Sequence, residues 1–136
     1  MTLGLSEIFE QVNKVKKSDR AAELKKHNTF AVRTILQGAF DSRIEWLLPE
    51  GTPPYKPSQL VDQENVLLHD ARRLVYFIKG GSPTLKQPKR EAMFIELLEA
   101  VAPKDAELLI AIKDKKFPFK GITKDIIKEA FPNLIP

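Results

Sequence analysis

Apolar residues recur in this sequence at three- and four-residue spacing, and Gly, Pro and polar residues interrupt the pattern at intervals. Such spacing places apolar side chains on one face of an α-helix. Helices are predicted over Leu5–Lys16, Ser18–His27, Thr29–Phe40, Asp62–Lys79, Lys89–Val101, Pro103–Ile112 and Thr123–Ala130. The chain is therefore expected to be all-α, with about seven helices.

Capping residues support these boundaries. N-caps are expected at Ser18, at Asn28 or Thr29, and at Thr123, because a side-chain oxygen there can accept from a free helical amide. Gly80-Gly81 is expected to end the fourth helix, since glycine adopts the left-handed C-terminal conformation at little cost.

The middle of the chain departs from the helical pattern. Ile44, Trp46 and Leu48 alternate like a strand, but no other segment offers a convincing partner, so we expect an extended or distorted stretch with Trp46 packed inward. Pro49–Pro57 follows, with four prolines, and is predicted to lie extended over the surface.

The size of the chain favours one compact domain over residues 1–136. Hydrophobic residues make up 43% of it, enough for a core. The alternative is two domains divided at Pro49–Pro57, but each half alone would bury too little surface. No apolar run approaches the roughly 18 residues of a membrane span, and no signal peptide is recognisable, so a cytoplasmic protein without membrane contact is expected.

No catalytic pattern is visible. The carboxylates fall at exposed helical positions, no Ser-His-acid spacing or phosphate-binding loop is present, and cysteine is absent. His69-Asp70 is more simply explained as an ordinary polar pair than as a metal site. We therefore expect no enzyme, no cofactor, no metal and no small-molecule substrate.

The basic residues are concentrated in two segments, although the net charge is only +4. Lys79–Arg90 holds four basic residues and no acid, and Lys113–Lys128 holds six against two acids. Such asymmetry is typical of a charged face that meets an anionic partner.

The first segment is a candidate phosphate-binding turn. Its glycines allow close approach of the backbone, and its hydroxyls and cations suit an anion. The candidate residues are Lys79, Gly80, Gly81, Ser82, Thr84, Lys86, Lys89 and Arg90. The alternative is a helix C-cap followed by a basic loop.

The second segment has the same layout, with a glycine and an N-capping threonine before a helix. Its candidate residues are Lys115, Lys116, Lys120, Gly121, Thr123 and Lys124. Phe117 and Phe119 are expected to pack in the core rather than to stack on bases. Two such turns, brought together, would straddle one duplex.

Glu107–Pro136 resembles the end of the N-terminal DNA-binding domain of ATP-dependent DNA ligases, above all those of T-even-type phages. Lys113-Asp114, Gly121, Thr123 and Phe131–Pro136 occupy the places of the family's pattern. The opening is also similar, with an amphipathic helix, a polar turn at Lys16–Asp19 and a second helix. The chain further resembles small proteins of T-even-like cyanophages.

The resemblance implies an all-α, ligase-type DNA-binding fold that contacts phosphates from the minor-groove side, with Lys120, Gly121, Thr123 and Lys124 as contacts. Asn133 replaces a family glycine, and the turn is longer. The K-x-D-G motif that accepts AMP is absent, so ligation is not expected.

These observations predict a non-enzymatic, phage-encoded protein of the host cytoplasm that binds duplex DNA, nicked or intact, without sequence preference. The alternative is a protein–protein adaptor that uses the same scaffold to modulate a host or phage replication or transcription factor. Pro49–Pro57 would then supply a docking edge.

Overall fold

The computed structural model describes residues 4–58, 67 and 71–136, and its architecture is all-α, as the periodicity predicts. The α-helices are α1 (Leu5–Lys14), α2 (Arg20–Lys25), α3 (Phe30–Phe40), α5 (Gln87–Ala100), α6 (Pro103–Lys113) and α7 (Lys124–Ala130). Two 3₁₀ helices, η1 (Lys17–Asp19) and η2 (Ala71–Phe77), complete the described elements. None of the helices in these ranges is long and apolar enough to cross a membrane.

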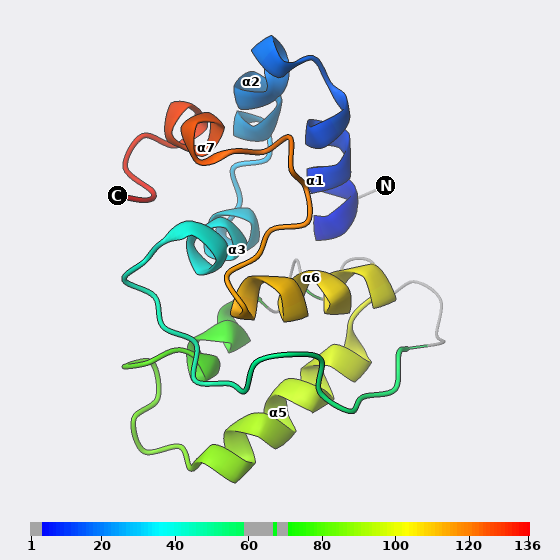
Figure 1. Ribbon diagram of the computed structural model, residues 1–136, viewed down its shortest axis with the longest axis vertical. Coiled ribbons are helices and arrows are strands. Elements are labelled where there is room, and N and C mark those ends of the chain that lie inside the picture. Colours follow the sequence, from blue (N-terminus) through cyan, green and yellow to red (C-terminus); the bar gives the residue numbers. More distant parts are fainter. Residues whose placement is uncertain (1–3, 59–66, 68–70) are drawn as a thin grey trace.

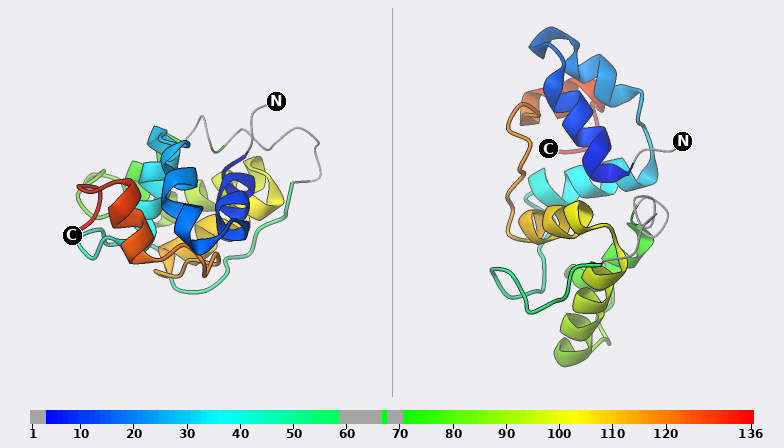
Figure 2. Two further views of the ribbon diagram at one scale, coloured as in Figure 1. Left: turned by 90° about the horizontal axis from the view of Figure 1, so that it is seen from above. Right: turned by 90° about the vertical axis from the view of Figure 1, so that its right-hand side faces the viewer.

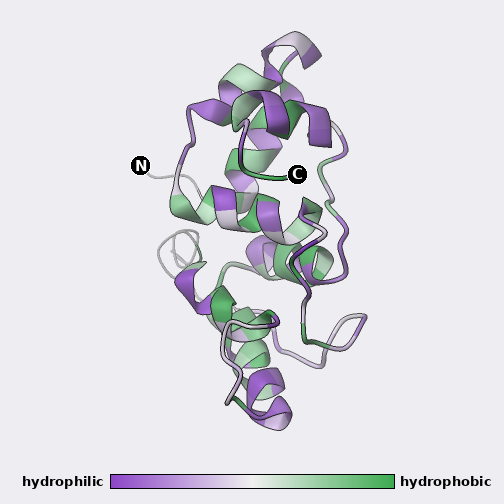
Figure 3. Cartoon of the chain, turned by 90° about the vertical axis from the view of Figure 1, so that its left-hand side faces the viewer, coloured by the Kyte–Doolittle hydropathy of each residue, from purple (hydrophilic) through white to green (hydrophobic). Residues whose placement is uncertain are grey.

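The helices are arranged along one long axis. Helices α1, α2 and α7 form one end, α3 and α6 cross the middle, and α5 with η2 forms the other end (Figures 1 and 2). Helix α2 packs on α7, and α6 packs on both α3 and α5. One core cluster runs through all of these contacts. Hydrophobic and hydrophilic residues alternate along the helices, as expected for amphipathic elements (Figure 3).

Two of the predicted N-caps are confirmed. The Thr29 hydroxyl accepts from the Val32 amide at 3.2 Å, and the Thr123 hydroxyl accepts from the Ile126 amide at 3.4 Å. The prediction for Ser18 is wrong, because Ser18 lies inside η1 and α2 begins without a side-chain cap. The polar residues Lys17–Asp19 between α1 and α2 form a 3₁₀ turn, and α1 ends earlier than expected, at Lys14.

The fourth predicted helix, Asp62–Lys79, falls partly on residues 62–66 and 68–70, which lie outside the described residues. Within this range, Ala71–Phe77 form the 3₁₀ helix η2 rather than an α-helix. Three residues per turn place Ala71, Leu74 and Phe77 on one buried face. Val75, which an α-helix would bury with them, is 43% exposed.

The chain leaving η2 pairs with the irregular stretch Asp41–Leu48. The Leu47 amide donates to the Phe77 carbonyl at 2.8 Å, and the Lys79 amide donates to the Glu45 carbonyl at 2.8 Å, forming an antiparallel bridge between Trp46 and Ile78. The extended stretch therefore has a partner, which the helical interpretation of residues 62–79 concealed.

Trp46 fixes this stretch to α3. Its indole N–H donates to the Gly38 carbonyl at 2.9 Å, and the ring packs against the core, as predicted. A Cβ at residue 38 would lie 2.6 Å from the ring, so glycine is required for this close approach.

Pro49–Pro57 crosses over α5 and is held to the protein body (Figure 1). The Lys56 amide donates to the Glu99 carboxylate at 2.8 Å, and the Gly51 amide donates to the Asp114 carboxylate at 3.1 Å. The buried Lys113 ammonium donates to the Gly51 carbonyl at 2.6 Å. Part of the backbone that a docking edge would offer is therefore already hydrogen-bonded.

Gly80 and Gly81 close η2 for different reasons. Gly80 adopts φ +86°, the left-handed region expected for it, whereas a Cβ on Gly81 would overlap the Val75 carbonyl oxygen. We expect Gly81→Ala to lower the free energy of unfolding by about 1–3 kcal/mol, because backbone must move to admit the methyl group. Urea unfolding measures this loss.

The matched control is Ser82→Ala in the same turn. The Ser82 side chain makes no hydrogen bond within the described structure, so its loss should change the free energy of unfolding by less than about 0.5 kcal/mol. Equal stability of the Gly81→Ala protein and wild type would contradict the close approach to Val75.

Candidate nucleic-acid interface

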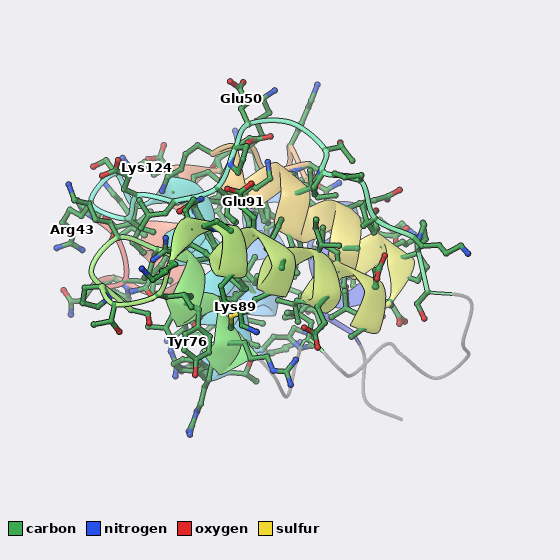
Figure 4. The ribbon with its side chains drawn as sticks, turned by 90° about the horizontal axis from the view of Figure 1, so that it is seen from below. Arg43, Glu50, Tyr76, Lys89, Glu91 and Lys124 are labelled. Atoms are coloured by element: carbon green, nitrogen blue, oxygen red, sulfur yellow. The ribbon has the colours of Figure 1, made fainter. Side chains whose placement is uncertain are left out.

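The structure does not bring the two predicted turns together. The Lys79–Arg90 turn joins η2 to α5 at one end of the long axis, whereas Gly121–Lys124 lies at the other end, beside α1 and α2 (Figure 1). Lys89 and Lys124 are well separated when the molecule is viewed from below as well (Figure 4). The turns therefore do not form the single paired site that the sequence suggests.

Arg90 is a cross-link within the first turn rather than an exposed anion contact. Its side chain is almost fully buried, and its guanidinium donates to three backbone carbonyls. The acceptors are Tyr76 at 2.9 Å, Ser82 at 3.2 Å and Leu85 at 3.2 Å. The expected phosphate role of Arg90 is corrected, because these bonds tie η2 and the turn to α5.

Most other groups of this turn also serve local structure. The Gly81 amide donates to the Ile78 carbonyl at 3.1 Å, and the Lys79 ammonium lies 3.6 Å from the Glu45 carboxylate. Gly80 and Thr84 are exposed, and Ser82 is half-buried. Lys86 and Lys89 are exposed and make no ion pair within the described part of the chain.

Gly121 in the second turn is enclosed by α1 and by the start of α2. Its amide donates to the Asn13 side-chain oxygen at 2.7 Å, and its carbonyl accepts from the Arg20 guanidinium at 3.2 Å. A Cβ here would overlap the Asn13 oxygen. The expected contact between the Gly121 amide and a phosphate is corrected, since that amide is already bonded.

Lys115 is also occupied within the protein. Its ammonium donates to the Gly38 carbonyl at 2.9 Å and the Asp41 carbonyl at 2.8 Å, which satisfies acceptors at the end of α3. Partial burial lowers the pKa of Lys115, and the nearby Asp41 carboxylate opposes this effect only in part. Its predicted DNA contact is therefore corrected to a helix-end contact.

The aromatic residues of this turn are half-buried and pack against the core, as predicted. The ring centroids of Phe9 and Phe117 are 5.2 Å apart, and those of Phe9 and Phe119 are 5.9 Å apart. Phe40 joins the cluster, with its centroid 5.3 Å from that of Phe117. These rings anchor the turn between α1 and α3, so they are not free to stack on bases.

The remaining candidates of the second turn are exposed. Lys116, Lys120 and Lys124 make no ion pair within the residues that the structure describes, and Thr123 caps α7. Asp125 begins the same helix, so the local charge is partly balanced.

The fold adds two lysines that were not among the predicted contacts. Lys16 and Lys17 lie at the α1–α2 junction, and both are exposed and unpaired within the described residues. Lys17 and Thr123 line one shallow depression, while Arg20 joins the junction to Gly121. We define the lysine surface as Lys16, Lys17, Lys120 and Lys124. The resemblance at Lys16–Asp19 was the available signal for the first pair.

The lysine surface presents positive charge on flexible side chains. Lysine ammonium groups on flexible stems can meet phosphates but supply no fixed base-reading geometry. Among the described residues, no group of three or more His, Asp or Glu side chains could hold a metal ion. The depression beside Lys17 is also lined by Asp125 and Glu129, which would face an incoming anion unfavourably.

The structural role of Arg90 can be tested by substitution. Arg90→Met keeps much of the apolar stem but leaves three carbonyls without their charged donor, so the free energy of unfolding should fall by at least about 2 kcal/mol. Lys89→Ala, on the exposed neighbour, should change it by less than about 0.5 kcal/mol. Urea unfolding measures the free energy of unfolding of both variants. Equal losses in the two variants would contradict the cross-link.

Comparison with known proteins gives a family but no function. No curated protein matches the chain, and no solved structure matches it. Residues 8–118, which include the α1–α2 junction, the Arg90 cross-link and Lys115, match a family described as "Family of unknown function (DUF6433)". The match covers most of the 136 residues, and the chain belongs to this family.

Proposed function

We propose that the protein is a non-catalytic DNA-binding protein that uses the lysine surface to contact the backbone of duplex DNA. The observation that carries the proposal is the contact of Gly121 with Asn13 and Arg20, which brings the segment that carries Lys120 and Lys124 next to the one that carries Lys16 and Lys17. None of the four is ion-paired within the described residues, so all four are available to a polyanion.

The chemistry of the surface favours the phosphate backbone over the bases. Lysine contacts with phosphate release counterions, a contribution that does not depend on sequence. Backbone contacts position a protein on DNA without reading base edges. We therefore infer sequence-independent binding, with an affinity that falls steeply as salt rises.

The ligase resemblance gives independent support. It places phosphate contacts in the turn before the last helix, where Lys120 and Lys124 are exposed. It also favours the minor-groove side of nicked or intact duplex and a phage-encoded protein that acts in the host cytoplasm. The proposed DNA interface consists of the second turn and the α1–α2 junction. It does not include the first turn, which lies at the far end of the molecule.

Salt titration tests the electrostatic mechanism. Four lysine–phosphate contacts predict that affinity for duplex DNA falls about 100-fold between roughly 50 and 200 mM salt. Lys120→Ala/Lys124→Ala should make the slope of log affinity against log salt shallower by about 2, equally for unrelated sequences. Fluorescence anisotropy with labelled duplexes measures both effects.

Lys86→Ala/Lys89→Ala is the matched control, because it removes two exposed lysines at the opposite end of the protein. This variant should bind DNA as wild type does. Undetectable binding at the lowest salt, or equal weakening by the two double variants, would count against the lysine surface.

A further inference from the structure

The 3₁₀ geometry of η2 gives it three distinct faces. Because residues three apart eclipse in such a helix, Ala71, Leu74 and Phe77 turn into the core. Arg72 and Val75 form a second face, which Ile78 continues just beyond the helix. This second face is not covered, since Val75 is 43% exposed.

The uncovered face of η2 forms one wall of a cleft. The opposite wall is α3, through Phe30, Thr34 and Gln37, at helical spacing. The side chains of Ile44 and Trp46 line the space between the two walls. Phe30 is 50% exposed at the cleft edge, so apolar surface remains in contact with solvent.

The cleft has one cationic lining residue, Arg72, and further arginines lie elsewhere on the two helices that form its walls. Neither α3 nor η2 contains an acidic residue, whereas they carry Arg33, Arg72 and Arg73. The Arg72 guanidinium lies 5.8 Å from the centroid of the Phe30 ring, close enough for a cation–π contact that orients it at the cleft. None of the three arginines is ion-paired within the described residues.

The size of the cleft limits its occupant. Its volume is about 200 Å³. Sites for small molecules usually measure about 300–1,000 Å³, and a duplex cannot enter such a space. One or two apolar side chains projecting from a partner helix or strand fit this volume, and apolar anchors framed by arginine are typical of protein–protein contacts.

We propose that the cleft between α3 and η2 binds an acidic amphipathic segment of another protein, which inserts apolar side chains beside Trp46 and places carboxylates against Arg72. Charge complementarity selects this occupant. The cleft supplies apolar walls and the Arg72 guanidinium, the wall helices α3 and η2 also carry Arg33 and Arg73 but no acid, and the ligand must supply the opposite charge.

Two other occupants fit less well. A second copy of this chain seated across a two-fold axis would bring the same arginines face to face, which like-charge repulsion disfavours. Single-stranded nucleic acid could stack on Phe30, but the aliphatic side chains of Ile44, Val75 and Ile78 offer no stacking surface. A protein segment uses both the aliphatic and the charged groups.

Trp46 provides a direct readout, because it is the single tryptophan of the chain and lines the cleft. The probe is a synthetic Leu/Glu amphipathic peptide of about 18 residues, long enough to form a helix. A twin peptide carries Lys at every Glu position, and oligothymidylate is the third ligand. We expect the acidic peptide to change Trp46 emission saturably, and the other two to leave it unchanged.

Variants locate the binding. Arg72→Glu/Arg73→Glu should weaken binding of the acidic peptide more than about tenfold, because it places like charges against the ligand. Thr34→Phe should do the same by filling the cleft, and circular dichroism confirms that each variant is folded. Lys86→Glu/Lys89→Glu is the charge-matched control and should bind the peptide as wild type does.

The outcomes separate this inference from the proposed function. Lys120→Ala/Lys124→Ala should retain peptide binding whatever its effect on DNA. Equal binding of the two peptides, absence of binding by the acidic peptide, or a change of Trp46 emission with oligothymidylate instead would each overturn the acidic-segment proposal.

Discussion

The need to satisfy buried backbone polar groups decides how this chain uses its basic residues. The connection from α6 to α7 passes close to α1, α2 and α3, and at each crossing a side chain or amide completes a hydrogen bond. Leaving such groups unsatisfied would cost more than an exposed lysine contributes. Gly121 and Lys115 therefore already make their hydrogen bonds within the protein.

The same residue types divide into two classes by position. Arg90 and Lys113 are buried and donate to carbonyls, whereas the lysine surface and the arginines of the α3–η2 cleft extend into solvent. A count of basic residues along the sequence cannot separate the classes, because burial depends on contacts between distant segments. The fold therefore places exposed positive charge in separate regions, among them the lysine surface and the α3–η2 cleft.

The sequence predicted the elements whose signals are local. Periodicity and the Thr29 and Thr123 caps located α3 and α7, and the pattern of α1 and α6 was equally clear. Periodicity did not predict the 3₁₀ helix at Ala71–Phe77, because its three-residue spacing and the three-to-four-residue spacing of an α-helix fit the same apolar residues. The Trp46–Ile78 bridge was also not predicted. The roles of Arg90, Lys115 and Gly121 depend on acceptors distant in space, which no local pattern encodes.

The acceptors of Arg90 differ in kind from those that hold the neighbouring proline segment. Its guanidinium donates to carbonyl and amide oxygens, so among the described residues this cross-link involves no carboxylate. The proline segment instead depends on Asp114, which contacts both the Gly51 amide and Lys113, and on Glu99. Loss of either carboxylate would therefore loosen the proline segment while the neighbouring turn stays closed.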